Sequence, residues 1–74
     1  MASTQVISEI ADRVFREESG RIVASLIRRF NNFDLAEDAV QDALIIALDR
    51  WPKEGAPDNP AAWITTTARR KAID

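Results

Sequence analysis

The stretch Asp34-Leu35-Ala36-Glu37-Asp38-Ala39-Val40-Gln41-Asp42-Ala43-Leu44 decides how this 74-residue chain folds. Asp34 is a residue type that caps helices, and Glu37 follows three positions later, as in a capping box. Acidic and apolar residues then alternate with the period of a helix that has two different sides. We expect this helix to run to about Arg50 or Trp51 and to stop before Pro52.

The two sides of this predicted helix differ in chemistry when residues are placed about 100° apart. One face holds Asp34, Asp38, Gln41, Asp42, Ile45 and Asp49. The other consists mainly of small apolar residues, which permit the close approach of another helix: Ala36, Val40, Ala43 and Ala47, with Ala39 and Leu44 at its edges. Because an aliphatic residue, Ile45, lies within the acidic face, that face is either a solvated surface or a binding surface for a partner.

The segment before Asp34 also reads as helical. Apolar residues at helical spacing predict a first helix from about Thr4 to Glu18 and a second from Glu18 or Gly20 to Arg29. Gly20 either separates these two helices or lies within one long bent helix, and we favour the break. The residues that give this spacing are Val6, Ile7, Ile10, Val14 and Phe15, then Ile22, Val23, Leu26, Ile27 and Phe30. Residues 31–33 are expected to form a turn.

The segment after Arg50 contains most of the helix breakers. All three prolines and one of the two glycines lie between residues 51 and 60, which predicts a loop over 51–59. Asn59 followed by Pro60 is a strong helix start, and the last helix is expected to continue to Asp74. The fold class is therefore an all-α, compact bundle of three to four helices. Because the final pattern has no stop signal, we expect the chain to be a fragment of a longer protein.

Composition excludes several classes of function. The length fits a single domain over residues 1–74, and no apolar run is long enough for a membrane span, so a cytoplasmic location is expected. Cysteine and histidine are absent, which removes disulfides, thiolate metal sites and the commonest general base. Asp38 and Asp42 lie one helical turn apart, but two carboxylates are too few ligands for a divalent ion. Neither an enzyme nor a cofactor is expected.

Charge is distributed unevenly along the chain, whose net charge is −2. Residues 34–58 carry seven acidic and two basic side chains, whereas residues 60–74 carry three basic and one acidic side chain. In the last predicted helix, one side holds Trp63, Thr67, Arg70 and Asp74, with Thr66 and Lys71 at its edges. Basic, hydroxyl and aromatic groups suit binding to single-stranded nucleic acid. Alternatively, Trp63 is a core residue and the run Arg69-Arg70-Lys71 complements the helix dipole.

Two motifs together resemble a known family. The stretch from Asp34 to Ala43 is similar to the D-A-E-D-L-V-Q-E-x-F signature of extracytoplasmic-function sigma factors of bacterial RNA polymerase. The segment Asn59-Pro60-Ala61-Ala62-Trp63-Ile64-Thr65-Thr66-Thr67-Ala68-Arg69-Arg70-Lys71-Ala72-Ile73-Asp74 resembles the P-x-A-W-L-x-x-I-A-R-N-x-A-I-D helix of the same family. The resemblance extends from about Val14 onward and corresponds to region 2.

The resemblance implies a partner for each charged segment. It implies docking on the clamp helices of the polymerase β′ subunit through Asp38, Gln41, Asp42, Ile45 and Asp49. It also implies recognition and melting of the minus-ten promoter element, with the non-template strand bound by the loop and the last helix. The candidate DNA-binding residues there are Lys53, Asn59, Trp63, Thr66, Arg69, Arg70 and Lys71. An anti-sigma factor, or a C-terminal extension of the protein itself, is a further possible partner.

The sequence departs from the family pattern at two positions. Arg70 stands where the family usually has Asn, and Thr67 replaces an Ile or Val. No counterpart of the second DNA-binding domain is present in the chain. Two other classes stay open: a helix-turn-helix regulator, which would need a turn of three or four residues instead of the nine expected here, and a helical dimerisation module.

Overall fold

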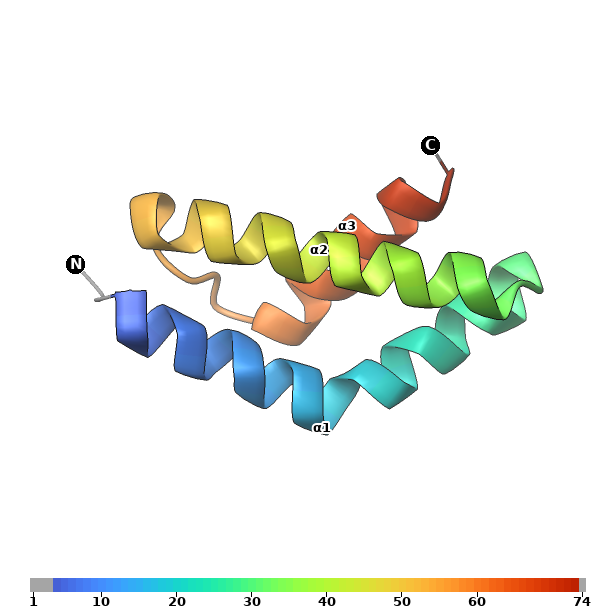
Figure 1. Cartoon of the computed structure of the whole chain (residues 1–74), viewed down its shortest axis with the longest axis horizontal. Coiled ribbons are helices and arrows are strands. Elements are labelled where there is room, and N and C mark those ends of the chain that lie inside the picture. Colours follow the sequence, from blue (N-terminus) through green and yellow to red (C-terminus); the bar gives the residue numbers. More distant parts are fainter. Residues whose placement is uncertain (1–3, 74) are drawn as a thin grey trace.

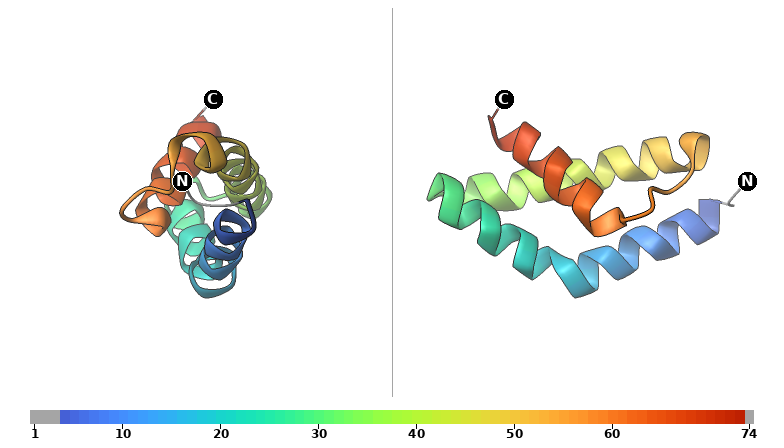
Figure 2. Two further views of the ribbon diagram at one scale, coloured as in Figure 1. Left: turned by 90° about the vertical axis from the view of Figure 1, so that its left-hand side faces the viewer. Right: turned by 180° about the vertical axis from the view of Figure 1, so that it is seen from behind.

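The computed structural model describes residues 4–73, which form three α-helices and no strand (Figure 1). Helix α1 spans Thr4–Phe30, α2 spans Phe33–Glu54 and α3 spans Pro60–Ile73. Helices α1 and α2 run in opposite directions, and α3 crosses them on one side of the pair (Figure 2). The expected all-α bundle is confirmed. None of these helices is both long enough and apolar enough to cross a membrane.

Helix α1 is continuous, so the favoured break at Gly20 is wrong and the alternative of one long helix is correct. A glycine inside a helix costs about 1 kcal/mol relative to alanine, which is too little to end a helix that packs on both sides of it. Val14 before the glycine and Ile22 after it are both buried in the same core. The helix bends near its middle, and the other two helices lie on the inner side of the bend (Figure 1).

The turn between α1 and α2 is built by two asparagines. Asn31 has a φ of 53°, and its backbone N–H donates to the Ile27 carbonyl at 2.6 Å, which closes the end of α1. Asn32 has an extended backbone, and its Oδ1 accepts a hydrogen bond from the Leu35 N–H at 3.0 Å. Asn32 is therefore the N-cap, and the expectation that Asp34 caps this helix is wrong. Asp34 lies in the first turn, where its charge favours the helix dipole.

Helix α2 continues through Pro52 to Glu54, past the expected end. A proline lacks the N–H that would bond to the carbonyl four residues earlier, so the helix loses one hydrogen bond at Pro52. Pro52 lies in the last turn of α2, where several carbonyl groups have no partner within the helix in any case. Gly55 then closes the helix by donating its N–H to the Trp51 carbonyl at 2.8 Å, with φ 89° and ψ 149°. The connection to α3 is therefore five residues, 55–59, and not nine.

The predicted start of α3 is confirmed. Pro60 is its first residue, and Asn59 Oδ1 accepts a hydrogen bond from the Ala62 N–H at 3.1 Å. The helix is described to Ile73, so the expected extension to Asp74 lies outside the described residues.

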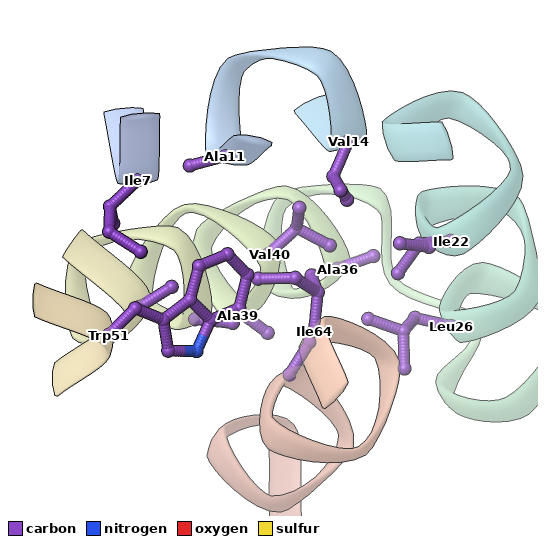
Figure 3. Packing of buried hydrophobic residues seen from close by; sticks show 13 residues of the cluster. Ile7, Ala11, Val14, Ile22, Leu26, Ala36, Ala39, Val40, Trp51 and Ile64 are labelled. Atoms are coloured by element: carbon purple, nitrogen blue, oxygen red, sulfur yellow. The ribbon is translucent and has the colours of Figure 1, made fainter. Parts of the chain in front are cut away.

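The buried residues of all three helices form one core (Figure 3). The predicted small face of α2 is confirmed, since Ala36, Ala43 and Ala47 are completely buried. These alanines lie between α1 and α3, and their small side chains allow both helices to approach closely. The largest fully buried side chains fill the space around them: Trp51, Ile7, Leu26 and Ile64.

Candidate functional site

The residues predicted to bind a protein partner all lie on one exposed surface. We name this surface the α2 stripe, and it consists of Asp34, Asp38, Gln41, Asp42, Ile45 and Asp49, each of which is exposed. It lies on the opposite side of α2 from Ala36, Ala43 and Ala47. Because that alanine face packs against α1 and α3, the stripe points away from both helices.

The chemistry of the α2 stripe combines free carboxylates with an apolar centre. Ile45 has 65% of its surface exposed. Asp38 and Asp42 make no ion pair with any residue between 4 and 73, so their carboxylates are available to a cationic partner. At the end of the stripe, Asp49 pairs with Lys53 at 3.4 Å between Oδ1 and Nζ. Such an exposed pair contributes at most about 0.5 kcal/mol, so either residue can exchange it for another partner.

An apolar groove, which the sequence did not predict, adjoins the α2 stripe between α1 and α2. It has a volume of about 380 Å³ and is lined by Ser8, Ala11, Asp12, Phe15, Leu44 and Leu48. Phe15 and Leu48 are 45% and 47% exposed. Each follows directly after a buried residue, Val14 or Ala47, and neighbours on a helix point about 100° apart. The rotation of about 100° from a buried neighbour could have indicated from the sequence that Phe15 and Leu48 lie outside the core.

The residues predicted to bind DNA are more dispersed. Thr66, Arg69, Arg70 and Lys71 are exposed on α3, Asn59 lies in the loop, and Lys53 lies in the last turn of α2. Asn59 already uses its side-chain oxygen to cap α3, although its amide N–H groups stay available. Thr66, Arg69 and Arg70 share the outer side of α3, whereas Lys71 points about 100° beyond Arg70.

Trp63 differs from the other candidate DNA-binding residues because it is partly buried against the core. Its ring meets that of Trp51 edge to face, with centroids 5.3 Å apart and ring planes at 70°. Such a pair stabilises the contact by about 0.5–1.5 kcal/mol beyond the buried area. Trp63 therefore has a structural role in joining α3 to α2.

The local geometry leaves two kinds of exposed surface on a small helical bundle, one acidic with an apolar centre and one basic. Residues 14–74 match the family model described as Sigma-70 region 2. The chain belongs to the sigma-70 region 2 family. This family consists of non-enzymatic transcription initiation factors. The region 2 domain also has the all-α fold that this membership implies.

The region 2 domain is 48% identical over 52 residues to an uncharacterized protein from Rhizobium meliloti (strain 1021). The match covers 70% of this chain and 12% of the relative, so the chain spans a small part of that protein's length. No solved structure gives a significant match. Between residues 4 and 73, no group of three or more acidic side chains is placed to hold a metal ion.

Proposed function

We propose that this region 2 domain docks on the β′ clamp helices of core RNA polymerase and binds the melted minus-ten element of a promoter. The observation that carries the proposal is the separation of charge on the fold. The α2 stripe points away from α3, and the exposed basic residues Arg69, Arg70 and Lys71 all lie on α3. One molecule can therefore hold a basic protein surface and an acidic nucleic acid at the same time.

The α2 stripe supports the polymerase half of the proposal. Carboxylates at Asp38 and Asp42 steer and pair with basic side chains of a coiled coil, and Gln41 can donate and accept hydrogen bonds. Ile45 supplies the apolar contact that the centre of a protein interface needs, surrounded by a polar rim. The adjoining groove with Phe15 and Leu48 would enlarge this apolar area.

The loop 55–59 and α3 support the DNA half. Arg69, Arg70 and Lys71 can neutralise phosphates, and Thr66 can donate a hydrogen bond to a phosphate oxygen. Lys53 and the amide N–H groups of Asn59 lie at the two sides of the loop, where they can contact the same strand. In this proposal Trp63 holds α3 in position, and its exposed edge offers a contact for an unstacked base.

The two motifs that resemble extracytoplasmic-function sigma factors support that subtype, which would act in the bacterial cytoplasm. An anti-sigma factor or a C-terminal extension of the longer protein would regulate the domain by covering the α2 stripe. Either partner would compete directly with the polymerase for Ile45 and its surroundings.

The decisive experiment measures binding of the chain to a β′ clamp-helix fragment. We expect the double substitution Gln41→Ala with Ile45→Lys to weaken binding at least roughly tenfold, equivalent to about 1.4 kcal/mol. The matched control is Ile73→Lys, which places the same charge at an aliphatic residue of nearly equal exposure, 63% against 65%, on another helix. The control should bind like the wild type.

Equal affinities for the double variant and the control would remove the α2 stripe from the interface. A wild-type chain that binds neither the fragment nor core polymerase would contradict the proposal as a whole. A helix-turn-helix regulator or a dimerisation module would give that result, and sedimentation of the chain alone would identify a dimer.

A further inference from the structure

The apolar groove between α1 and α2 belongs to a longer seam that is centred on Phe15. Phe15 lines this groove, whose volume is about 380 Å³, and it also lines a smaller hollow of about 80 Å³. The hollow lies farther along the same helix pair, where Val23 and Val40 contribute to its wall. The half-exposed ring of Phe15 therefore stands between two recesses. One face of the molecule thus presents both an exposed aromatic ring and a recess of suitable size for such a ring.

The fold leaves this face uncovered. Helix α3 crosses the other side of the α1–α2 pair, since it lies behind the pair in Figure 1 and in front of it in the right-hand view of Figure 2. Every residue that lines the groove or the hollow belongs to α1 or α2. Ile45 lies one turn from Leu48 and extends the apolar surface outward along α2. A continuous apolar area of this kind points to a second surface that covers it.

The charges on the α1 side of the seam are balanced, unlike those of the α2 stripe. Arg16 Nη2 lies 2.9 Å from Asp12 Oδ2, and Asp12 also lines the groove. The side chains of Arg16 and Asp12 are 71% and 59% exposed, so each can exchange its partner. Asp12 precedes Arg16 by one helical turn. A second α1 that runs in the opposite direction presents the same two charges in reverse order, so each arginine faces an aspartate.

We propose that the α1–α2 seam binds a second copy of this chain in a two-fold symmetric dimer, in which the two α1 helices are antiparallel. Such an interface uses the same patch on both copies. Phe15 lies between Asp12 and Arg16 along α1, so an axis that pairs these charges passes close to Phe15. The ring of each copy then enters the α1–α2 groove of the other. A surface with balanced charges and both a ring and a recess fits a copy of itself better than it fits a purely basic partner.

The available area limits the strength of this dimer. A stable interface covers roughly 800 Å² of each partner. The molecule extends over 39 × 23 × 18 Å, so an entire long face would be needed to supply that area. The apolar seam occupies only part of such a face. Exchange of the Asp12–Arg16 pair replaces one exposed ion pair with another, so it fixes the orientation of the copies more than it adds affinity. We therefore expect a weak dimer that forms at high protein concentration.

The dimer would regulate polymerase docking, and this consequence rests on the proposed function. It covers Leu48 and the surroundings of Ile45, which the proposed function assigns to the β′ contact. One copy therefore cannot hold a second copy and the clamp helices at the same time. Salt should shift the balance, because docking through Asp38 and Asp42 weakens as salt increases. Two copies that each have a net charge of −2 repel each other less in salt, so the dimer should become stronger.

The first test compares two exposed phenylalanines by sedimentation equilibrium of the chain over a range of concentrations. Phe15 and Phe33 are 45% and 56% exposed, but Phe33 lines neither the groove nor the hollow. We expect Phe15→Glu to raise the dissociation constant of the dimer at least roughly tenfold. Phe33→Glu makes the same change in charge and should dimerise like the wild type. A wild-type chain that stays monomeric at every concentration, or equal dissociation constants for the two variants, would overturn the proposal.

The antiparallel arrangement has a separate test that leaves Phe15 unchanged. In a dimer of the Asp12→Arg variant, positive charges would face each other, and in a dimer of the Arg16→Asp variant, negative charges would. Each variant alone should therefore lose self-association. An equimolar mixture of the two variants restores both ion pairs and should sediment as a heterodimer. If circular dichroism shows that both variants are folded and the mixture still contains no heterodimer, the antiparallel dimer is wrong.

A titration with the β′ clamp-helix fragment separates this inference from the proposed function. If the chain dimerises but does not bind the fragment or core polymerase, the dimer stands and the proposed function fails. If the chain binds the fragment and never dimerises, the proposed function stands and the dimer fails. If the chain does both, the added fragment should convert the dimer into complexes with one copy of the chain. A complex that holds two copies would contradict the competition between dimerisation and docking.

Discussion

Trp51 of α2 and Trp63 of α3 pack edge to face across the helix boundary, with ring centroids 5.3 Å apart. Trp51 is almost completely buried, and Trp63 is partly buried over it. These rings lie on either side of the loop 55–59, so the contact fixes how α3 leaves α2. The position of every basic residue on α3 therefore depends on this pair.

We expect Trp63→Ala to lower the free energy of unfolding by about 2 kcal/mol, because it removes both apolar contact and the aromatic pair. Urea denaturation followed by circular dichroism measures the change. Thr66→Ala, on the exposed side of the same helix, should change stability by less than about 0.5 kcal/mol. A stable Trp63→Ala variant that has lost DNA binding would instead assign this ring to the DNA.

The two glycines should respond in opposite directions to alanine. An added Cβ at Gly20 meets no atom within 4 Å, and α1 is continuous there. Gly20→Ala should therefore stabilise the protein by about 0.5–1 kcal/mol. At Gly55 the space is also open, but φ is +89°, so Gly55→Ala should cost about 1–3 kcal/mol. Thermal unfolding of the two variants beside the wild type tests the contrast, and destabilisation by Gly20→Ala would contradict a continuous α1.

The N-cap of α2 can be tested by comparing the side chains of Asn32 and Asp34. Asn32→Ala removes the bond to the Leu35 N–H and should cost about 1 kcal/mol. Asp34→Ala removes a charge near the helix start and should cost about 0.3–1 kcal/mol at low salt, and less at high salt. Denaturation at two salt concentrations distinguishes them. If Asp34→Ala lowered the free energy of unfolding more than Asn32→Ala, at both salt concentrations, Asp34 would be the N-cap instead.

The alanine face of α2 should not accept a larger side chain. Ala43 is completely buried between the other helices, so Ala43→Leu should destabilise the fold by about 1–3 kcal/mol. Asp42→Leu adds a leucine at the next position, on the exposed side, and should change stability by less than about 0.5 kcal/mol. The free energies of unfolding of the two variants give the answer. Similar values would mean that the helices do not pack closely at Ala43.

The two roles of Asn59 can be separated by changing one group at a time. Asn59→Asp keeps a capping oxygen and adds a negative charge, so stability should stay the same while affinity for single-stranded DNA falls. Asn59→Ala should lower stability by about 1 kcal/mol through loss of the cap. Fluorescence titration and urea denaturation on the same samples provide both measurements. Unchanged DNA affinity in Asn59→Asp would limit this residue to capping.

Where the sequence-based predictions failed, a local signal was outweighed by its surroundings. Gly20 and Pro52 both disfavour helix, but each lies where adjoining residues bury apolar surface, Ile22 in one case and Trp51 in the other. Asp34 and Asn32 are comparable caps by type, and the turn through Asn31 placed the helix start two residues earlier than expected. The assignment of residues to polymerase binding and to DNA binding stays a prediction, which the substitutions proposed above test.

The sequence by itself determined the all-α class, the small buried face of α2 and the start of α3 at Asn59-Pro60, because helical periodicity and capping act over a few neighbouring residues. The tertiary structure decided how α3 crosses the α1–α2 pair. That crossing half-buries Trp63 and places Arg21 and Arg28 opposite Thr65. A groove between two helices depends on side chains far apart in the chain, and no local pattern specifies which of them meet.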